Sequence, residues 1–558
     1  MSIKLVNNKG FKWERHGTLS IKGFIVNPID EYSTDELKLV KKLFKNQYST
    51  NELLDILKNA DHIVEILDCI NVLNGQFAVV IENEDFIFAA VDNIRSIPIF
   101  YKENGNLEIS DSPYELLSED ENVPDEFALL QYEISGNTWA NRTLISGINS
   151  LSAGEYLFYK KNSNELIVDE YMRFSYRNDF DQSETASKDR IITAYKIAAK
   201  RLAAIANGDT IMLPLSGGED SRIVAHTLKS IGYENVICYS YGLSKNAESN
   251  LSKSIAEFLG YKWIFAPFDD LDWREWYISD EYRDFSKYAS NLVSTPHFQD
   301  YHAVKYFKEH NMIPDNAIFA PGHSGDFIHG DHIPSVFINS KHLNIDYIAT
   351  ELFRELAINK KFNGNSKQFK DIINEIKKEI RPAKNASRND MISYYEFFDW
   401  KEKQSKMIAN SVRVYEYFGY RWHMMLWNRT VFEAWETVVP ELRYHRRLHY
   451  KIVTDIQRDL RTAIGVTSTG NPDGGLKNKL KDFIRKMPPN IYRNIFFNYK
   501  NKNLQNEYDA HHLDWYKIKT KSEFDRISSE YSTINGIVSS DMLDRFKSDF
   551  NWKDNGGI

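Results

Sequence analysis

The chain has 558 residues, of which 42% are hydrophobic and 27% charged, so we expect a soluble globular protein of two or more domains. Its formal net charge of -8 argues against a general nucleic-acid binder. The two cysteines, Cys69 and Cys238, lie in apolar runs without a C-x-x-C pattern, which favours buried free thiols in a reducing cytoplasm over a zinc site. The N-terminus lacks the apolar core of a secretion signal, and no apolar run is long enough to span a bilayer.

Residues 1–170 are predicted to be mostly β-structure. The apolar runs FAVVI (77–81) and FIFAAV (86–91) are separated by four polar residues, which is the pattern of a β-hairpin. An α+β sandwich would bury a set of elements of this kind. The other elements predicted in this part are strands at 97–101 and 107–109 and helices at 34–44 and 52–59.

Three segments of this part resemble the glutaminase domain of asparagine synthetases: LNGQFAVVI (73–81), AAVDNIRSIPIFY (89–101) and LEISDSPYELL (107–117). Residues 143–171 resemble the link from that domain into the family's synthetase domain. The resemblance implies a four-layer αββα fold of the N-terminal-nucleophile type for residues 1–170.

The nucleophile position departs from this family. The family uses a cysteine that becomes residue 1 after methionine removal, whereas this chain has Ser2, whose hydroxyl lacks the low pKa of a thiol. The family's R-G-P-D stretch is absent from the N-terminal region, and Arg95 lies near, not on, the usual arginine. Asn74 and Gly75 are either part of an oxyanion site or a plain turn at a strand end. We therefore expect an inactive glutaminase domain kept for structure, although a serine nucleophile is chemically feasible.

The segment TIMLPLSGGEDSRIVAHTLKS (210–230) is predicted to form a strand, a glycine turn and a helix, after an amphipathic helix at 190–206. The turn would direct backbone N–H groups to one point beside the positive end of the helix, which suits a phosphate. Asp220 is unfavourable beside an anion unless it holds a bridging cation such as Mg²⁺. The alternative is a tight turn without a ligand.

The six residues SGGEDS within this segment resemble the SGGxDS pyrophosphate loop of the ATP pyrophosphatases, which cut ATP to AMP and pyrophosphate. They lack the G-K-[ST] ending of a Walker loop. Strand and helix patterns alternate after the loop, which predicts a parallel α/β sheet with ligands at the carboxyl ends of its strands. The predicted strands are 236–242, 261–267 and 317–322, and the predicted helices are 248–259 and 300–309.

A second glycine-rich stretch, PGHSGDFIHGDH (321–332), follows the last of these strands. It resembles the loop after the last ATP-binding strand of asparagine synthetases, and by position Asp326 matches that family's second magnesium aspartate. Asp220 and Asp326 would then hold Mg²⁺ on the leaving pyrophosphate, and the alternative is a surface turn. His323 stands where the family has a glutamate, and it is either a base for the incoming amine or a polar wall of the pocket.

Residues 340–460 are predicted to be largely helical, and they resemble the region that covers the family's synthetase site. The family's lysine, which stabilises charge on the acyl-adenylate and on pyrophosphate, has two candidates here, Lys451 and Lys477. For both, the alternative is a surface lysine in a salt bridge. The basic, aromatic stretch 471–505 is either a solvated helix face or a site for an anionic acceptor or a membrane surface.

The resemblance implies a ligase that uses ATP and Mg²⁺ to adenylate a small-molecule or peptide carboxylate and passes it to ammonia or an amine. The expected fold is an αββα sandwich (1–170), then an α/β parallel-sheet domain of the ATP-pyrophosphatase type with a helical C-terminal part (171–470), then a basic extension (471–558). The catalytic candidates are His323, Asp220 and Lys451. The nucleotide-binding candidates are Leu215, Ser216, Gly217, Gly218, Asp220, Ser221, Ser240, Tyr241, Gly242, Pro321 and Gly322, and the metal ligands are Asp220 and Asp326.

The amine source stays open at this point: free ammonia, a separate glutaminase, or an amine of the substrate itself, as in β-lactam synthetases and lasso-peptide cyclases. The carboxylate is open as well. Asparagine biosynthesis is the family's own reaction, but the change to His323 favours a substrate other than aspartate, such as a sugar acid of a surface polysaccharide. A non-catalytic ATP-binding relative is the alternative from another class. We expect a cytoplasmic protein, and the resemblance is compatible with a homodimer.

Overall fold

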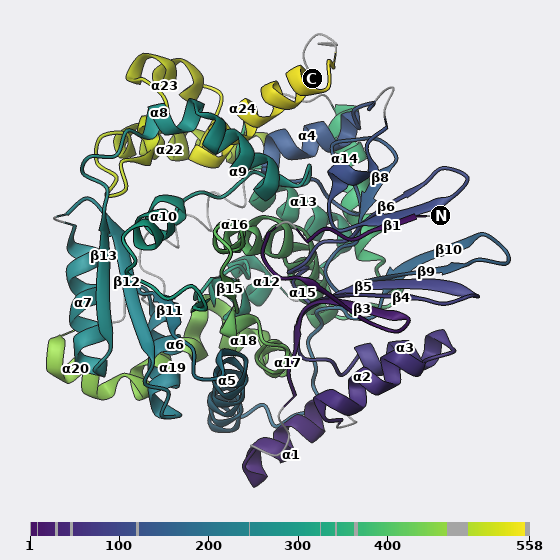
Figure 1. The fold of residues 1–558 in the computed structure, drawn as a ribbon. Coiled ribbons are helices and arrows are strands. Elements are labelled where there is room, and N and C mark those ends of the chain that lie inside the picture. Colours follow the sequence, from purple (N-terminus) through teal and green to yellow (C-terminus); the bar gives the residue numbers. More distant parts are fainter. Residues whose placement is uncertain are drawn as a thin grey trace.

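The computed structural model describes residues 2–7, 9–27, 32–44, 48–118, 122–244, 246–323, 325–340, 343–361, 366–465 and 489–552. Within these ranges the chain forms a mixed α/β fold with three sheets of four, six and five strands (Figure 1). None of the helices in these ranges is both long and apolar enough to cross a membrane.

The six-stranded sheet is antiparallel and lies in the N-terminal part. Its strands, in spatial order, are β10 (Glu165–Glu170), β9 (Glu155–Lys160), β5 (Phe86–Val91), β4 (Gly75–Glu82), β3 (Leu19–Ile25) and β2 (Trp13–His16). β4 and β5 pair with Val80 opposite Ala89, which confirms the predicted hairpin.

The four-stranded sheet packs face to face against the larger one. Its strands, in spatial order, are β1 (Ser2–Lys4), β7 (Leu107–Ser110), β6 (Phe100–Glu103) and β8 (Ile148–Ser150). Successive residues of β4 point to opposite faces, so Ala78 and Val80 share a buried cluster with Ile109 of the smaller sheet. Phe77 and Val79 belong to a different cluster, on the outer face of the larger sheet.

Helices cover both outer faces, which gives the αββα layer order expected for these residues (Figure 1). α2 (Thr50–Asn59) and α3 (Ile63–Ile70) bury Leu53 and Ile66 against the larger sheet. α4 (Glu126–Ser135) lies on the side of the smaller sheet. α1 (Thr34–Leu43) and α2 confirm the predicted helices and both begin with capping boxes, whereas α3 was not predicted.

The five-stranded sheet is parallel throughout. Its strands, in spatial order, are β13 (Lys262–Pro267), β12 (Val236–Gly242), β11 (Ile211–Pro214), β14 (Ile318–Phe319) and β15 (Arg421–Trp422). The helices that alternate with its strands are α5 (Glu184–Ala206), α6 (Glu219–Ser230), α7 (Ala247–Leu259) and α10 (Tyr301–Glu309). The predicted alternation is confirmed, although β14 is shorter than 317–322 and β15 was missed.

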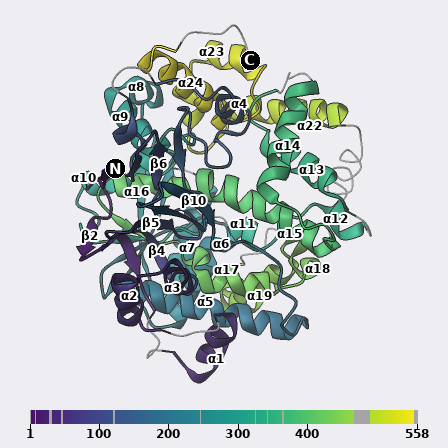
Figure 2. The same cartoon turned by 90° about the vertical axis from the view of Figure 1, so that its right-hand side faces the viewer.

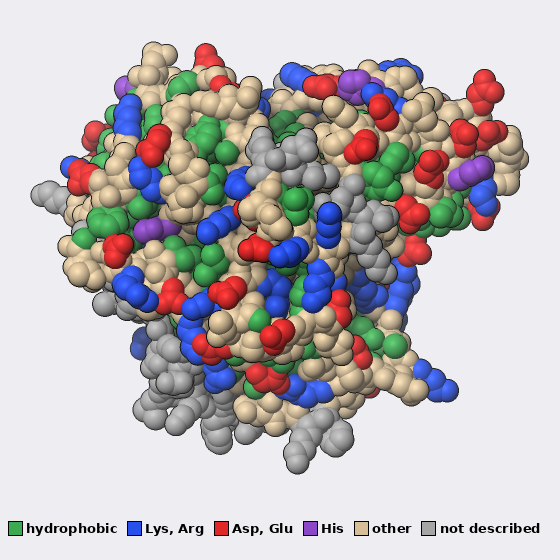
Figure 3. Space-filling model, turned by 90° about the horizontal axis from the view of Figure 1, so that it is seen from below, with side chains coloured by type: hydrophobic (Ala, Val, Ile, Leu, Met, Phe, Trp, Pro, Cys, Tyr) green, Lys and Arg blue, Asp and Glu red, His purple; other side chains and the backbone are tan. Residues whose placement is uncertain are grey.

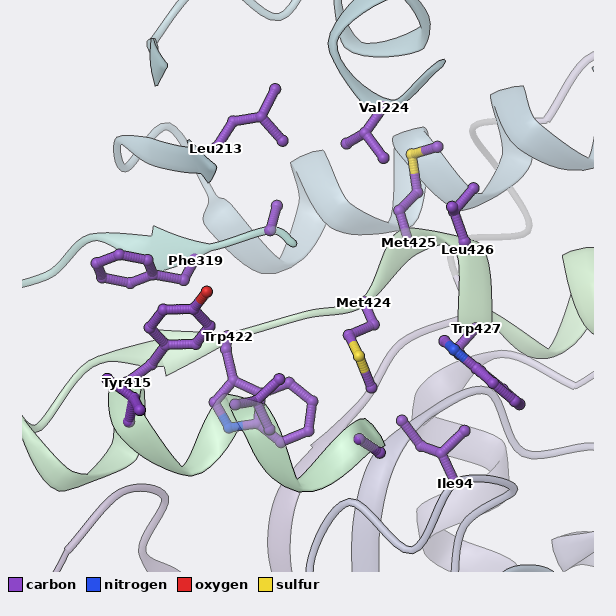
Figure 4. Packing of buried hydrophobic residues seen from close by; sticks show 14 of the residues in the cluster. Ile94, Leu213, Val224, Phe319, Tyr415, Trp422, Met424, Met425, Leu426 and Trp427 are labelled. Carbon is purple, nitrogen blue, oxygen red and sulfur yellow. The ribbon is translucent and has the colours of Figure 1, made fainter. Parts of the chain in front are cut away.

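One apolar core joins the parallel sheet to the N-terminal sandwich. Tyr415 stacks on Phe319 of β14 with ring centroids 4.3 Å apart. Met424, which follows β15, points toward Ile94 of the N-terminal part (Figure 4). The two parts are therefore packed together and not merely linked.

Helices dominate after the sheet, as predicted for 340–460. Those of this region and of the segment before it are α8 (Trp273–Ile278), α9 (Asp280–Ser290), α11 (Gly325–Ile328), α12 (Ser335–Asn339), α13 (Ile345–Leu356), α14 (Ser366–Ile380), α15 (Arg388–Phe398), the π-helix η3 (Asp399–Ile408), α16 (Arg413–Tyr417), α17 (Arg429–Glu436), α18 (Pro440–Arg443), α19 (Arg447–Ile456) and α20 (Arg458–Ile464).

The C-terminal helices pack onto the rest of the molecule. They are α22 (Pro489–Glu507), α23 (Lys521–Ser528) and α24 (Ile534–Asp549), and α23 and α24 lie close to α8 and α4 in two views (Figures 1 and 2). The Trp273 indole N–H donates to the Leu513 carbonyl at 2.9 Å, which ties this segment to α8. Much of the basic stretch 471–505 lies outside the described residues. On the face of the molecule shown in Figure 3, Lys and Arg side chains are interspersed with Asp and Glu.

Candidate functional site

A pocket with a volume of about 280 Å³ opens at the carboxyl ends of β11 and β12. This is the edge of a parallel sheet where ligands bind in open α/β folds. Its lining residues are Pro214, Leu215, Ser216, Gly218, Asp220, Ser221, Tyr239, Ser240, Tyr241, Asn246, Glu248, Ser249, Gln299, Asp300, Gly322, His323 and His512.

The glycine turn at 216–221 forms one wall of the pocket. The Ser216 and Ser221 hydroxyls lie 3.2 Å apart, and the Gly218 N–H donates to the Ser216 Oγ at 3.0 Å. Gly218 is the N-cap of α6 and gives the helix no side-chain hydrogen bond. The first N–H groups of α6 are therefore left for an anion, at the positive end of the helix dipole.

Two glycines let the loop after β14 press against the start of α6. A Cβ on Gly322 would lie 2.8 Å from the Ser221 backbone nitrogen, and one on Gly325 would lie 2.3 Å from the Asp220 carboxyl carbon. Any larger residue would separate loop and helix. The two glycine-rich stretches singled out in the sequence therefore meet, although Ser324 between these glycines lies outside the described residues.

Asp220 and Asp326 are brought together on one guanidinium. Arg446 Nη2 donates to Asp220 Oδ1 at 2.9 Å, and Nη1 donates to Asp326 Oδ1 at 2.7 Å. Glu219 adds a third carboxylate, whose Oε2 lies 3.6 Å from Arg446 Nη2. Carboxylate oxygens are the donors that Mg²⁺ prefers, and a cationic group already lies between Asp220 and Asp326, so this pair has the chemistry of a divalent-ion site. Among the described residues, the three ligand groups whose donor atoms lie within 4.8 Å of one another are Asp220, His329 and His449.

Two fully buried histidines hold this cluster in place. His329 Nδ1 lies 3.1 Å from Asp220 Oδ1, and its Nε2 lies 2.9 Å from the Tyr195 hydroxyl. His449 stacks on His329 with ring centroids 3.6 Å apart, and its Nε2 accepts from Arg446 at 2.8 Å. Burial lowers the pKa of His449 to about 3 and also lowers the pKa of His329, so both rings are neutral at pH 7.

Arg446, His329 and His449 were missed by the sequence analysis. Arg446 follows Asp220 by 226 residues, and no spacing pattern relates the two. The only signal in the sequence for Arg446 was electrostatic. Carboxylates that lie together at an anion-binding site require a positive charge nearby.

Another part of the pocket lining is built around Asp300, which the sequence analysis did not select. The Tyr241 and Tyr415 hydroxyls donate to its carboxylate. Ser240 Oγ and His323 Nδ1 are buried atoms that have no hydrogen-bond partner among the described residues, so a ligand in the pocket can meet them. Burial lowers the pKa of His323, which keeps its ring uncharged and makes it a weaker base than a histidine in water.

The C-terminal segment completes the pocket with His512. The Leu243 N–H donates to the His512 carbonyl at 2.9 Å, and His512 Nε2 lies 3.5 Å from a Glu248 carboxylate oxygen. Gly242 has a φ of +121°, and a Cβ there would lie 2.9 Å from the His512 carbonyl oxygen. The segment that the sequence marked only as an extension thus belongs to the site.

The remaining candidates lie apart from this pocket or beside it. The Lys451 ammonium on α19 pairs with Glu184 at the surface, and Lys477 lies outside the described residues. Arg95 is buried and donates through Nε to the Leu151 carbonyl at 3.0 Å. Three nucleotide-binding candidates do not line the pocket themselves, although each is adjacent in the chain to a residue that does. They are Gly217, Gly242 and Pro321.

The residues considered for a glutaminase site have different hydrogen-bond partners. Ser2 is the first residue of β1 and lies near the turn between β6 and β7 (Figure 1). The Ser2 hydroxyl donates to the Glu108 carboxylate at 3.2 Å. Gly75 begins β4 and lies opposite Ile25 of β3. The Asn74 Oδ1 accepts from the buried Arg201 at 2.7 Å. Ser2 and Asn74 thus bond to different partners, Glu108 and Arg201.

No protein-family model matches the chain, and no curated protein matches it. One similar solved structure is glutamine phosphoribosylpyrophosphate amidotransferase from B. subtilis complexed with ADP and GMP, at 13% identity and a TM-score of 0.16, over 45% of this chain and 46% of that chain. Another, described as the allosteric regulatory enzyme of purine biosynthesis, shows 13% identity and a TM-score of 0.16 over 45% of each chain. The chain thus spans less than half the length of these structures, and at such TM-scores neither similarity carries an argument about fold or activity.

Proposed function

We propose that this chain is an ATP-dependent ligase that forms an amide. It adenylates a substrate carboxylate, releases pyrophosphate and passes the acyl group to ammonia or an amine. The observation that supports this most directly is the glycine turn at 216–221, which leaves the first N–H groups of α6 open beside Asp220 and Asp326. A phosphate-sized anion site next to carboxylates suited to a divalent ion is what such nucleotide chemistry requires.

In the first step an oxygen of the substrate carboxylate attacks the α-phosphorus of ATP. The bond from that phosphorus to the bridging oxygen breaks, and pyrophosphate leaves with the electron pair. The N–H groups of the turn and the Ser216 and Ser221 hydroxyls bind the phosphate oxygens as their charge increases. Mg²⁺, when bound by Asp220 and Asp326, neutralises phosphate charge.

In the second step the nitrogen of ammonia or an amine attacks the acyl carbon, and AMP leaves with the electron pair of the broken C–O bond. The nitrogen loses a proton as the amide forms. We assign His323 as the group that receives this proton, because it lines the pocket and its Nδ1 has no partner among the described residues. Lys451 has no role in this scheme, since its ammonium pairs with Glu184.

The nitrogen comes from outside the N-terminal sandwich in this proposal, because Ser2 and Asn74 each hydrogen-bond elsewhere. Free ammonia, ammonia from a separate glutaminase, or an amine on the substrate itself would each satisfy the second step. The last of these would make the product a cyclic amide, which is the second candidate function.

The proposal is tested by incubating the full-length protein with ATP, Mg²⁺, ammonium and one carboxylate at a time, with mass spectrometry of the nucleotide products. The panel comprises aspartate, uronic-acid sugars and small peptides. We expect AMP and pyrophosphate with one carboxylate class, in equal amounts. Product from a peptide without added ammonium would identify the cyclic-amide reaction. Failure of the protein to bind ATP, or release of ADP instead of AMP, would refute the proposal.

His512→Ala is expected to weaken ATP binding about fivefold, because it removes one polar side chain from the pocket lining, a loss of about 1 kcal/mol. Isothermal titration calorimetry of the full chain with ATP measures this. His310→Ala is the matched control, since His310 is exposed and bonds to the Tyr306 carbonyl of its own helix. Equal ATP affinities for the His512 variant and the wild type would exclude the C-terminal segment from the nucleotide site.

A further inference from the structure

A guanidinium lies where the proposed function requires a divalent ion. Arg446 does not form a bidentate pair with a single carboxylate, which is the usual arrangement of arginine–carboxylate pairs. Instead, one nitrogen bonds Asp220 and the other bonds Asp326, at 2.9 Å and 2.7 Å. Three carboxylates face this one guanidinium, because Glu219 is also within 3.6 Å, so the cluster keeps a net negative charge.

The backbone at His445 and Arg446 is strained. His445 and Arg446 have φ values of 52° and 59°, which residues with a Cβ rarely adopt, and here two of them are consecutive. Helix α19 begins at the next residue. Strained residues of this kind persist only when surrounding contacts hold them, and they gather at functional sites. Arg446 is held by hydrogen bonds to Asp220, to Asp326 and to His449, which lies one turn further along α19.

The two ends of the guanidinium differ in their access to solvent. The Asp326 side chain is 57% exposed, whereas those of Asp220 and Arg446 are 18% and 12% exposed. An ion arriving from solvent therefore meets Asp326 first, and the Arg446–Asp326 bond is the one it can replace. The Asp220 bond is enclosed by His329 and the loop at Gly325.

We propose, building on the function above, that Arg446 is a displaceable counter-ion: it neutralises the Asp220–Asp326 pair in the free protein, yields a carboxylate to the divalent metal, and then turns its guanidinium to the phosphates. Guanidinium groups bind phosphate oxygens well. Among the described residues that line the pocket there is no lysine or arginine, so the phosphates need a cation from its edge. Arg446, bonded to the lining residue Asp220, is in that position.

The test uses two probes on the full-length protein: Mn²⁺ alone, followed by electron paramagnetic resonance, and inorganic pyrophosphate in saturating Mn²⁺, followed by calorimetry. In Arg446→Met we expect Mn²⁺ to bind about tenfold more tightly, since a competing positive charge is gone, and pyrophosphate to bind about tenfold more weakly. A residue with a merely structural role would not shift the two affinities in opposite directions. Arg446→Lys, which keeps the charge but cannot span both carboxylates, should show a smaller shift of the same signs and serves if the methionine variant fails to fold.

Arg447→Met is the matched control, because it removes the same charge one residue away, where the side chain faces Tyr444. It should change neither affinity more than twofold. Mn²⁺ affinity that is unchanged or weaker in Arg446→Met, or absence of Mn²⁺ binding in every variant, would overturn the inference. Because Mn²⁺ binding is measured without ATP, a wild type that forms no AMP would refute the proposed function and leave the metal result standing.

Discussion

Asp220→Asn is expected to lower the rate of AMP formation by about three orders of magnitude, the cost typical of losing one group that stabilises transition-state charge. Asparagine keeps the shape that packs against Gly325, where a single Cβ would already collide with the carboxyl group. It removes the charge that pairs with Arg446 and is proposed to bind the metal. Pyrophosphate release in the presence of the identified carboxylate measures the effect, and circular dichroism checks the fold.

The matched control is Asp331→Asn, since Asp331 is an exposed carboxylate a few residues beyond Asp326. It should leave the rate of AMP formation unchanged. A folded Asp220→Asn protein that forms AMP at the wild-type rate would mean that the glycine turn and the carboxylate pair are not the adenylation site.

Lys401→Met is expected to destabilise the protein by about 3–5 kcal/mol, because it leaves buried carboxylates without their counter-ion. The Lys401 side chain is 1% exposed, and its ammonium lies 2.7 Å from Glu155 of β9, 3.0 Å from Glu170 of β10 and 3.3 Å from Glu379 of α14. Burial by itself lowers the pKa of Lys401, but the negative charges of Glu155 and Glu170 outweigh it and raise that pKa. This lysine therefore joins the N-terminal sandwich to η3 and α14.

Urea unfolding followed by far-ultraviolet circular dichroism measures this loss of stability. The control is Lys403→Met, two residues along the same π-helix, whose ammonium lies 4.0 Å from its nearest carboxylate, on Glu355. Weak pairs of that kind contribute about 0–1 kcal/mol, so the control should unfold close to the wild-type midpoint. A Lys401→Met midpoint equal to that of the control would show that the three glutamates are satisfied without the lysine.

The elements around the pocket were predictable because their signals are local. The apolar run 211–215 specifies a buried strand, and the glycine turn and helix that follow need no other part of the chain. The β4–β5 hairpin is local in the same sense, because four polar residues join its two apolar runs. The two-residue strand β15 left no periodic pattern to find, since it exists only by pairing with β14, about 100 residues earlier.

For the candidate site, the sequence by itself predicted the glycine turn that contains Asp220, because that signal lies in adjacent residues, and it pointed to Asp326 through the family resemblance. Only the tertiary structure decided which cation meets them: Arg446 reaches both, whereas Lys451 pairs with Glu184. His449 and His512 likewise enter the cluster and the pocket through the packing of α19 and the C-terminal segment. Hydrogen bonds and ion pairs depend on the distance between two groups in space. For residues more than 200 positions apart, the packing of helices on the sheet sets that distance, and the spacing in the sequence does not predict it.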